Sequence, residues 1–219
     1  MAGYAAVAVI CLALFGILTA AVKWGWTETW DTRLMLALAA ERRPALTVCM
    51  KLLSVTGSGL VEFPVAFLLI GTLLMRGRKA QARWYAGAVL SGWALYALAK
   101  LAVHRHRPNV ITHLMHGAGW YSYPSGHSML APLVFGLGAI AWATPWRSPA
   151  RRTSALMLAA VLALAIGVSR VYLGSHYPSD VIGGLLLGSA WSALSVMWWE
   201  RRRERSSGRP ASLGVVTDL

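Results

Sequence analysis

The sequence predicts an all-α, polytopic integral membrane protein with six transmembrane helices. Of its 219 residues, 57% are hydrophobic and only 13% are charged, whereas a soluble domain carries roughly 25% charged residues. Long runs with few or no charges also recur along the chain. A helix needs about 20 predominantly apolar residues to span a bilayer, and several of these runs approach that length. Composition and run length together therefore place the chain in a membrane.

The apolar runs give the expected order of the spans. The first run, 4–22, contains no charged residue. A cleaved signal peptide is the alternative, but it needs a basic n-region, and residues 1–3 carry no side-chain charge. Glu62 lies near the outer end of the second run, where a carboxylate is expected to be interfacial rather than buried and functional. We expect the six spans at residues 4–22, 60–75, 84–100, 125–143, 154–171 and 181–199.

The segment between the first two spans, residues 23–59, is expected to form short helices that lie along the membrane surface. Trp24, Trp26 and Trp30 cluster at its start, as aromatic residues do at a bilayer interface. The segment serves either as a structural connector or as part of a rim through which lipids enter. In the second case Arg33, Arg42 or Arg43 would meet lipid head groups.

The distribution of basic residues gives the expected orientation. If the loops alternate sides, the loops 76–83 and 144–153 and the tail 200–219 together carry twelve Lys and Arg residues, against nine on the opposite face. The positive-inside rule then places both termini in the cytoplasm. The net charge of +13 therefore reflects membrane topology, and no nucleic-acid partner is expected.

The chain is expected to contain one domain. Residues 1–199 would form a single membrane-embedded unit, with the motifs that carry its chemistry between residues 100 and 180. Residues 200–219 are polar and basic, and we expect them to form a disordered cytoplasmic tail. The two cysteines, Cys11 and Cys49, predict neither a disulfide nor a thiol-based metal site.

Three stretches place cations, histidines and a carboxylate at the ends of apolar runs. In the first, Lys100 and Arg107 are seven residues apart, so on a continuous helix they would share a face about two turns long. Arginine and lysine suit phosphate because they donate to its oxygens, although a lysine at a helix end can instead merely reach the interface. Pro108 would fix the exit from the helix. Three further residues are either solvated at the interface or add to the phosphate field, namely His104, Arg105 and His106.

The second stretch, Pro124–His127, opens the fourth span. Proline and serine suit the first turn and the cap of an ordinary helix, and that is the structural alternative. The same geometry presents free N–H groups and the positive end of the helix dipole, which bind anions. Gly126 would let an oxyanion approach the backbone, with His127 standing beside it.

The third stretch, residues 169–180, supplies the expected nucleophile. A neutral histidine can attack phosphorus through one ring nitrogen, and it needs a partner on the other nitrogen to fix its tautomer. His176 and Asp180 would meet either as neighbours on one helix or because Pro178 starts the sixth helix and Asp180 reaches back. Arg170 would hold the phosphate from another side. The alternative is a helix cap with an incidental histidine.

Together, the three stretches resemble the signature of the type 2 phosphatidic acid phosphatase superfamily, also called lipid phosphate phosphatases. That signature reads K-x-x-x-x-x-x-R-P, then P-S-G-H, then S-R-x-x-x-x-x-H-x-x-x-D. Here the corresponding letters are KLAVHRHRP, PSGH and SRVYLGSHYPSD, in the same order and with no departure at a defining position. The resemblance covers residues 84–195 closely.

The resemblance implies a role for each matching residue. His176 would be the nucleophile, Asp180 its orienting partner, and His127 the general acid that protonates the leaving group. Members of this family work without a metal, so no metal and no other cofactor is expected. With both termini in the cytoplasm, the site would lie on the periplasmic face of a bacterial inner membrane. The phosphate would be held by Lys100, Arg107, Ser125, Gly126 and Arg170.

The activity implied by the resemblance is hydrolysis of a lipid phosphate or pyrophosphate monoester that enters from the bilayer, through a phosphohistidine intermediate. The SHYPSD and YSYPSGHS surroundings look most like bacterial phosphatidylglycerophosphatase B-type and undecaprenyl-pyrophosphate phosphatases. The implied substrates are therefore undecaprenyl pyrophosphate, phosphatidylglycerophosphate and phosphatidic acid. A lipid A 1-phosphatase or a lipid phosphotransferase of the same superfamily is the alternative, and a non-catalytic lipid-binding membrane protein is a more remote one.

Overall fold

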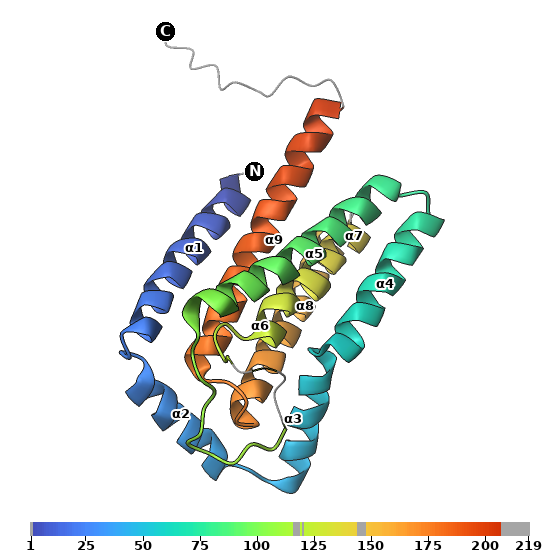
Figure 1. The fold of residues 1–219 in the computed structure, drawn as a ribbon. Coiled ribbons are helices and arrows are strands. Elements are labelled where there is room, and N and C mark those ends of the chain that lie inside the picture. The colour runs from blue at the N-terminus through green and yellow to red at the C-terminus, as the bar shows by residue number, and fades with distance from the viewer. Residues whose placement is uncertain (1, 116–118, 120, 144–147, 207–219) are drawn as a thin grey trace.

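The computed structural model describes residues 2–115, 119, 121–143 and 148–206, which form a bundle of helices (Figure 1). Within these residues the only extended pairing is one antiparallel bridge between His106 and Tyr121, so the all-α prediction is confirmed. In chain order the helices are α1 (Ala2–Lys23), α2 (Glu28–Ala40), α3 (Pro44–Thr56), α4 (Gly59–Met75), α5 (Lys79–Val103), α6 (Gly126–Ala131), the π-helical turn η1 (Pro132–Gly136), α7 (Leu137–Ala143), α8 (Pro149–Tyr172) and α9 (Pro178–Ser206).

Five of these stretches are long and apolar enough to cross a membrane: α1, α5, the continuous run Gly126–Ala143, α8 and α9. The prediction of the second span was only partly right. With 17 residues, α4 would rise about 25 Å, which is less than the roughly 30 Å of a hydrocarbon core. It qualifies only together with α3, which meets it at a bend of 46°. Six spans are reached when this bent pair is counted as one broken span, which agrees with the number predicted.

The longest helix, α9, packs along α1, α6 and α8, and its glycines allow the approach to α6. A Cβ atom added to Gly188 would lie 2.2 Å from the carbonyl oxygen of Met129, and one added to Gly184 would lie 2.5 Å from that of Ser125. Small residues allow such close contact between helices in membranes. The backbone N–H of Ser125 consequently donates to the carbonyl of Asp180 at 2.9 Å. Helix packing thus joins two of the three motif stretches directly.

Residues 200–206, which we expected to belong to a disordered tail, continue α9 as helix. The sequence there is ERRRERS, and glutamate and arginine are strong helix formers. The guanidinium of Arg202 also lies over the ring of Trp198, 5.2 Å from its centroid. The rest of the expected tail, residues 207–219, lies outside the described part of the chain.

The connecting segment has a more specific structural role than expected. The guanidinium of Arg42 donates to the carbonyl of Tyr172 at 2.7 Å and 3.2 Å, so it ties the loop between α2 and α3 to the end of α8, as a structural connector would. Arg33 and Arg43 are exposed. The interfacial placement expected for Glu62 was wrong, because its side chain is only 2% exposed within the bundle.

Candidate active site

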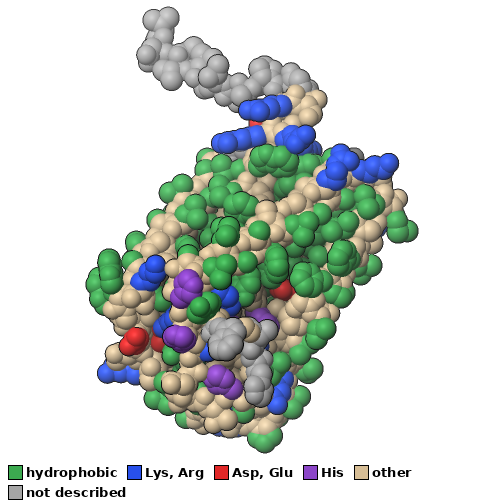
Figure 2. Space-filling model, in the orientation of Figure 1, with side chains coloured by type: hydrophobic (Ala, Val, Ile, Leu, Met, Phe, Trp, Pro, Cys, Tyr) green, Lys and Arg blue, Asp and Glu red, His purple; other side chains and the backbone are tan. Residues whose placement is uncertain are grey.

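Three segments that are distant in the sequence meet at one end of the bundle. They are the loop that follows α5, the start of α6, and the turn between α8 and α9, which all lie toward the lower end in Figure 1. Histidine side chains gather on the surface near this end (Figure 2). The seven motif side chains singled out in the sequence, together with Gly126, all come from these three segments or from the adjoining end turns of the helices next to them.

His176 lies in the turn between α8 and α9 and is 2% exposed. The turn is closed by the backbone N–H groups of Ser175 and His176, which donate to the carbonyl of Arg170 at 3.0 Å and 3.3 Å. Gly174 adopts a φ of 83°, which glycine tolerates without strain. Pro178 starts α9 and Asp180 falls in its first turn. Asp180 therefore reaches back toward His176 from the start of α9, which is the second of the two geometries expected for this pair.

The two ring nitrogens of His176 face opposite charges. Nδ1 lies 3.4 Å from Oδ2 of Asp180, within ion-pair range but without a hydrogen bond of good geometry. Nε2 lies 3.5 Å from a guanidinium nitrogen of Arg107. Burial first, and then the positive charges of Arg170, Arg107 and Lys100, lower the pKa of His176 well below its usual value. The imidazole is therefore neutral near pH 7, with one nitrogen available as a nucleophile.

Arg107 reaches the site from a loop and not from the helix that carries Lys100. The continuous helix assumed for the pair ends at Val103, and His104 follows in the left-handed region with a φ of 57°. The Arg107 guanidinium donates to the carbonyl oxygens of Gly119 at 2.8 Å and Ser175 at 2.7 Å. The break in the helix thus turns Arg107 toward the histidine turn.

The other two cations approach from the membrane-spanning helices. Arg170, in the last turn of α8, is 2% exposed, donates to the Ser54 hydroxyl of α3, and leaves its Nε–H without a partner among the described residues. Lys100 is half-buried, with its ammonium 4.9 Å from the centre of the Tyr96 ring. A buried N–H donor without a partner is unfavourable, so Arg170 offers a donor to an anion in the site.

The start of α6 differs in detail from its expected role. The N–H of Ser125 is already bonded to Asp180, and its buried hydroxyl accepts from Ser128 at 3.1 Å. A Cβ atom on Gly126 would lie 2.9 Å from the Tyr96 ring, so the glycine makes room for this ring. His127 is half-buried and experiences the charges of the same three cations as His176. Both histidines therefore belong to one electrostatic environment.

Sequence analysis missed the role of Arg105, which binds two buried carboxylates. One guanidinium nitrogen lies 2.7 Å from Oδ1 of Asp180, and the other lies 2.7 Å from Oδ2 of Asp31 on α2. Both carboxylates are fully buried. Burial alone would lower the pKa of Arg105, but the two carboxylates outweigh it and hold that pKa above its usual value.

The backbone and side chain of Ser179 complete this network. Its N–H donates to Oδ1 of Asp31 at 2.9 Å, and its hydroxyl donates to Oδ2 at 2.6 Å. The remaining oxygen of Asp180 accepts from the N–H of Tyr177 at 2.9 Å. One sequence signal could have indicated Asp31: it lies four residues before the apolar Met35, so the two share a face of a helix. In the structure both side chains are fully buried.

The described residues contain no group of three or more His, Cys, Asp or Glu that could hold a metal ion. The carboxylate that faces His176, Asp180, is bound to Arg105. The expectation that no metal is required remains a prediction. The site offers positive charge from three side chains around a neutral histidine.

A neutral histidine that faces a carboxylate and lies among cations suits chemistry on phosphate-like anions, and the comparisons with known proteins identify phosphatases. The PAP2 superfamily matches residues 81–204. Phosphatidylglycerophosphatase B of Bacillus subtilis is 31% identical over 180 residues, which cover 80% of this chain and 85% of that protein. The crystal structure of a transmembrane PAP2 type phosphatidylglycerolphosphate phosphatase from Bacillus subtilis superposes with a TM-score of 0.83 at 26% identity, over 89% of this chain and 96% of that one.

Two other relatives match over shorter regions. An undecaprenyl-diphosphatase of Sulfolobus acidocaldarius is 40% identical over 79 residues, or 35% of this chain and 32% of that protein. A lipid A 1-phosphatase of Rhizobium etli is 31% identical over 138 residues, or 56% and 55% of the two chains. The chain belongs to the PAP2 superfamily. It is a membrane protein and an enzyme of the phosphatase type.

Replacing Arg105 by Gln should lower the phosphatase kcat by about 10- to 100-fold, the range seen when the groups that orient the ligands of a metal ion are removed, because Arg105 orients a carboxylate in the same indirect way. Asp180 would lose its cation and could no longer hold His176 in one orientation. Arg105→Lys should recover part of the rate, because the charge returns without the planar fork. Steady-state kinetics on the purified variants would measure this effect.

The matched control is Arg33→Gln, which removes an equal charge from an exposed position on α2. Its kcat should stay at the wild-type value. A wild-type kcat in folded Arg105→Gln protein would show that Asp180 does not depend on Arg105.

Proposed function

We propose that this protein is an integral membrane lipid phosphatase that hydrolyses phosphate or pyrophosphate monoesters of lipids through a phosphohistidine, without a metal. The observation that carries the proposal is the placement of His176. Its ring is buried and neutral, one nitrogen faces Asp180, and the other faces Arg107. A phosphate group bound to Arg107 would lie next to this second nitrogen. The nitrogen is therefore placed to attack the phosphorus.

In the proposed first step, Nε2 of His176 attacks the phosphorus, and the bond from phosphorus to the leaving oxygen breaks. Asp180 faces Nδ1 and stabilises the positive charge that develops on the ring. His127 donates a proton to the leaving oxygen, and the bound phosphate favours the protonated form that this requires. In the second step, water attacks the phosphohistidine, His127 takes a proton from the water, and neutral His176 and phosphate are released.

The cations would bind the non-reacting phosphate oxygens and stabilise the charge of the transition state. Arg107 and Arg170 approach His176 from different elements, and Arg170 has an unused N–H. Ser125 would contribute its hydroxyl proton, since its N–H is bonded to Asp180. Lys100 and the Gly126 region complete the proposed site. Positive charge from side chains would serve where other phosphatases use a metal ion.

The substrate class follows from the relatives and from the membrane setting. Undecaprenyl pyrophosphate, phosphatidylglycerophosphate and phosphatidic acid are the proposed substrates, and each would enter from the bilayer with its tails in lipid. Lipid A 1-phosphatase activity is a second candidate, supported by the relative of that name. We further propose that residues 1–199 act as one domain in a bacterial inner membrane, with the site on the periplasmic face and both termini in the cytoplasm.

His176→Ala should reduce phosphate release from a lipid phosphate to background, because the attacking nitrogen is lost. Brief incubation of wild-type protein with substrate labelled in the phosphate, followed by alkaline quenching, should trap an acid-labile phosphohistidine that the variant lacks. The control is His106→Gln, an exposed histidine in the loop after α5, which should keep both activity and label. Label retained on His176→Ala protein would disprove the assignment.

A panel of lipid monophosphates and pyrophosphates in detergent should show which class the site prefers. His127→Ala should slow substrates with a poor alkoxide leaving group more than pyrophosphates, whose leaving group needs less protonation. Equal losses across the panel would contradict the acid role. Recovery of the label in an added lipid acceptor, and not in free phosphate, would identify a phosphotransferase.

The activity should depend on pH through the neutral form of His176. Because its pKa lies well below its usual value, loss of rate by protonation of this ring should begin only at a pH well under about 6.5, its unperturbed pKa. Arg107→Gln removes a neighbouring positive charge, which raises the pKa and should move the acid limb of kcat/KM to higher pH. Arg33→Gln should leave the limb unmoved. A limb that stays fixed or falls in Arg107→Gln protein, with the same substrate, would contradict this role.

A further inference from the structure

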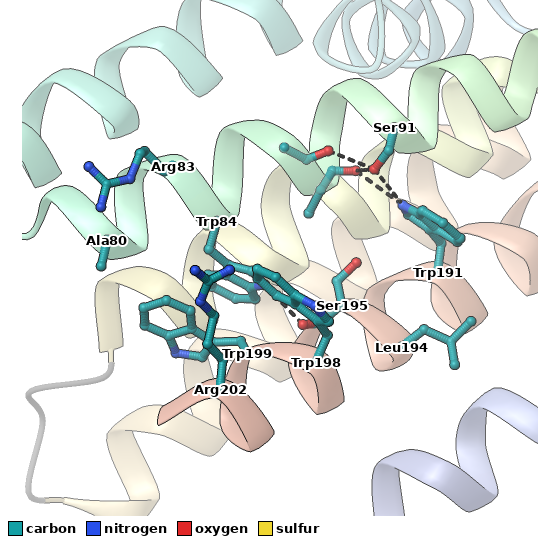
Figure 3. Close-up of a pocket in the computed structure, with 12 residues that line it drawn as sticks. Ala80, Arg83, Trp84, Ser91, Trp191, Leu194, Ser195, Trp198, Trp199 and Arg202 are labelled. Carbon is teal, nitrogen blue, oxygen red and sulfur yellow. Dashed lines mark hydrogen bonds between the residues drawn. The ribbon is translucent and has the colours of Figure 1, made fainter. Parts of the chain in front are cut away.

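A second candidate binding region lies at the opposite end of the bundle from His176. It is a groove of about 610 Å³ between α5 and α9 (Figure 3). On α5 it runs along Arg83, Gly87 and Ser91, which are spaced by four residues and therefore follow one face over about 12 Å. No residue of the phosphate site lines it.

The charge at this groove is positive. Arg83 and Arg202 lie toward one end of it, and Trp191 and Ser91 toward the other (Figure 3). Both arginines are exposed, and no Asp or Glu is among the described residues that line the groove. Lys and Arg side chains also gather on the surface at this end of the bundle (Figure 2). An anion is therefore the complementary ligand.

The remainder of the groove is apolar and aromatic. The indole N–H of Trp84 donates to the carbonyl of Ser195 at 2.9 Å, and that of Trp191 donates to the carbonyl of Ala88 at 3.2 Å. With their polar edges bonded to protein, these rings present carbon surface to the groove. A Cβ atom added to Gly87 would have no neighbour within 4 Å, so the groove has room for a hydrocarbon chain beside α5.

We propose that this groove binds an anionic phospholipid of the bilayer leaflet opposite the phosphate site. Its phosphate would lie between Arg83 and Arg202, and an acyl chain would extend past Gly87 toward Trp191. Basic pockets between transmembrane helices bind anionic lipid head groups in this way, and tryptophans mark the level of the interface. A second copy of the chain is a poorer occupant, because a two-fold contact would bring these arginines against their symmetry mates.

The experiment is native mass spectrometry of the protein released from nanodiscs that contain equal amounts of phosphatidylglycerol and phosphatidylcholine. Wild-type protein should retain phosphatidylglycerol in preference. In the double variant Arg83→Gln/Arg202→Gln that preference should fall by about fivefold for each arginine removed, which corresponds to about 1 kcal/mol per charge. The control, Arg151→Gln/Arg152→Gln, removes two exposed charges from the start of α8 and should retain the preference.

Gly87→Leu tests the apolar part of the site separately. The added side chain would fill the groove while both arginines stay in place, so retention of phosphatidylglycerol should fall although the charge is unchanged. Lipid retention is measured without turnover, so its result is independent of the proposed catalytic function. Equal retention of both lipids by wild-type protein, or equal losses in the groove and control variants, would overturn the proposal. A dimer that Gly87→Leu disrupts would also overturn it, because a second copy would then occupy the groove.

Discussion

The buried ion pairs of Arg105 hold together the parts of this protein on which its site depends. The guanidinium bonds Asp31 and Asp180 at 2.7 Å each, and both carboxylates are fully buried. Charges taken out of water are unfavourable unless each has a partner, so none of the three groups can move alone. They belong to α2, to the loop after α5 and to α9. One network therefore sets the place of Asp180, and through it the orientation of His176.

Positive charge has two consequences in the site. Arg107, Arg170 and Lys100 would attract a phosphate group, and the same charges, after burial, keep His176 neutral. Binding and nucleophilicity thus have one electrostatic origin. The negative charge of Asp180 by itself would favour protonation of His176. Arg105 and the N–H of Tyr177 also bind the Asp180 carboxylate, and this weakens its influence on the histidine. The site can therefore combine a carboxylate partner with a histidine that remains unprotonated.

The sequence predicted the helical class, most span positions and the family motifs, because these depend on local composition and on residue identity at fixed spacings. The sequence-based prediction was less accurate where the end of a helix, or the burial of a side chain, depends on contacts with other segments. The helix of the expected second span, α4, has only 17 residues, and a sixth span is counted only when α3 is joined to it. Arg107 lies in a loop because the helix stops at Val103. Residues 200–206 extend α9, as their glutamates and arginines favour, and were wrongly assigned to the tail. Glu62 is buried by helices that its own segment does not reveal.

By itself the sequence determined which residues are available for chemistry, since three spaced motifs contain every nucleophile, carboxylate and cation proposed for the site. Tertiary structure alone decided which of them meet. Asp31 and Arg105 are 74 positions apart, and neither matches a defining position of those motifs. Likewise, the groove between α5 and α9 exists only where two separate helices diverge. Burial and pairing are properties of contacts between distant segments, and no local pattern encodes them.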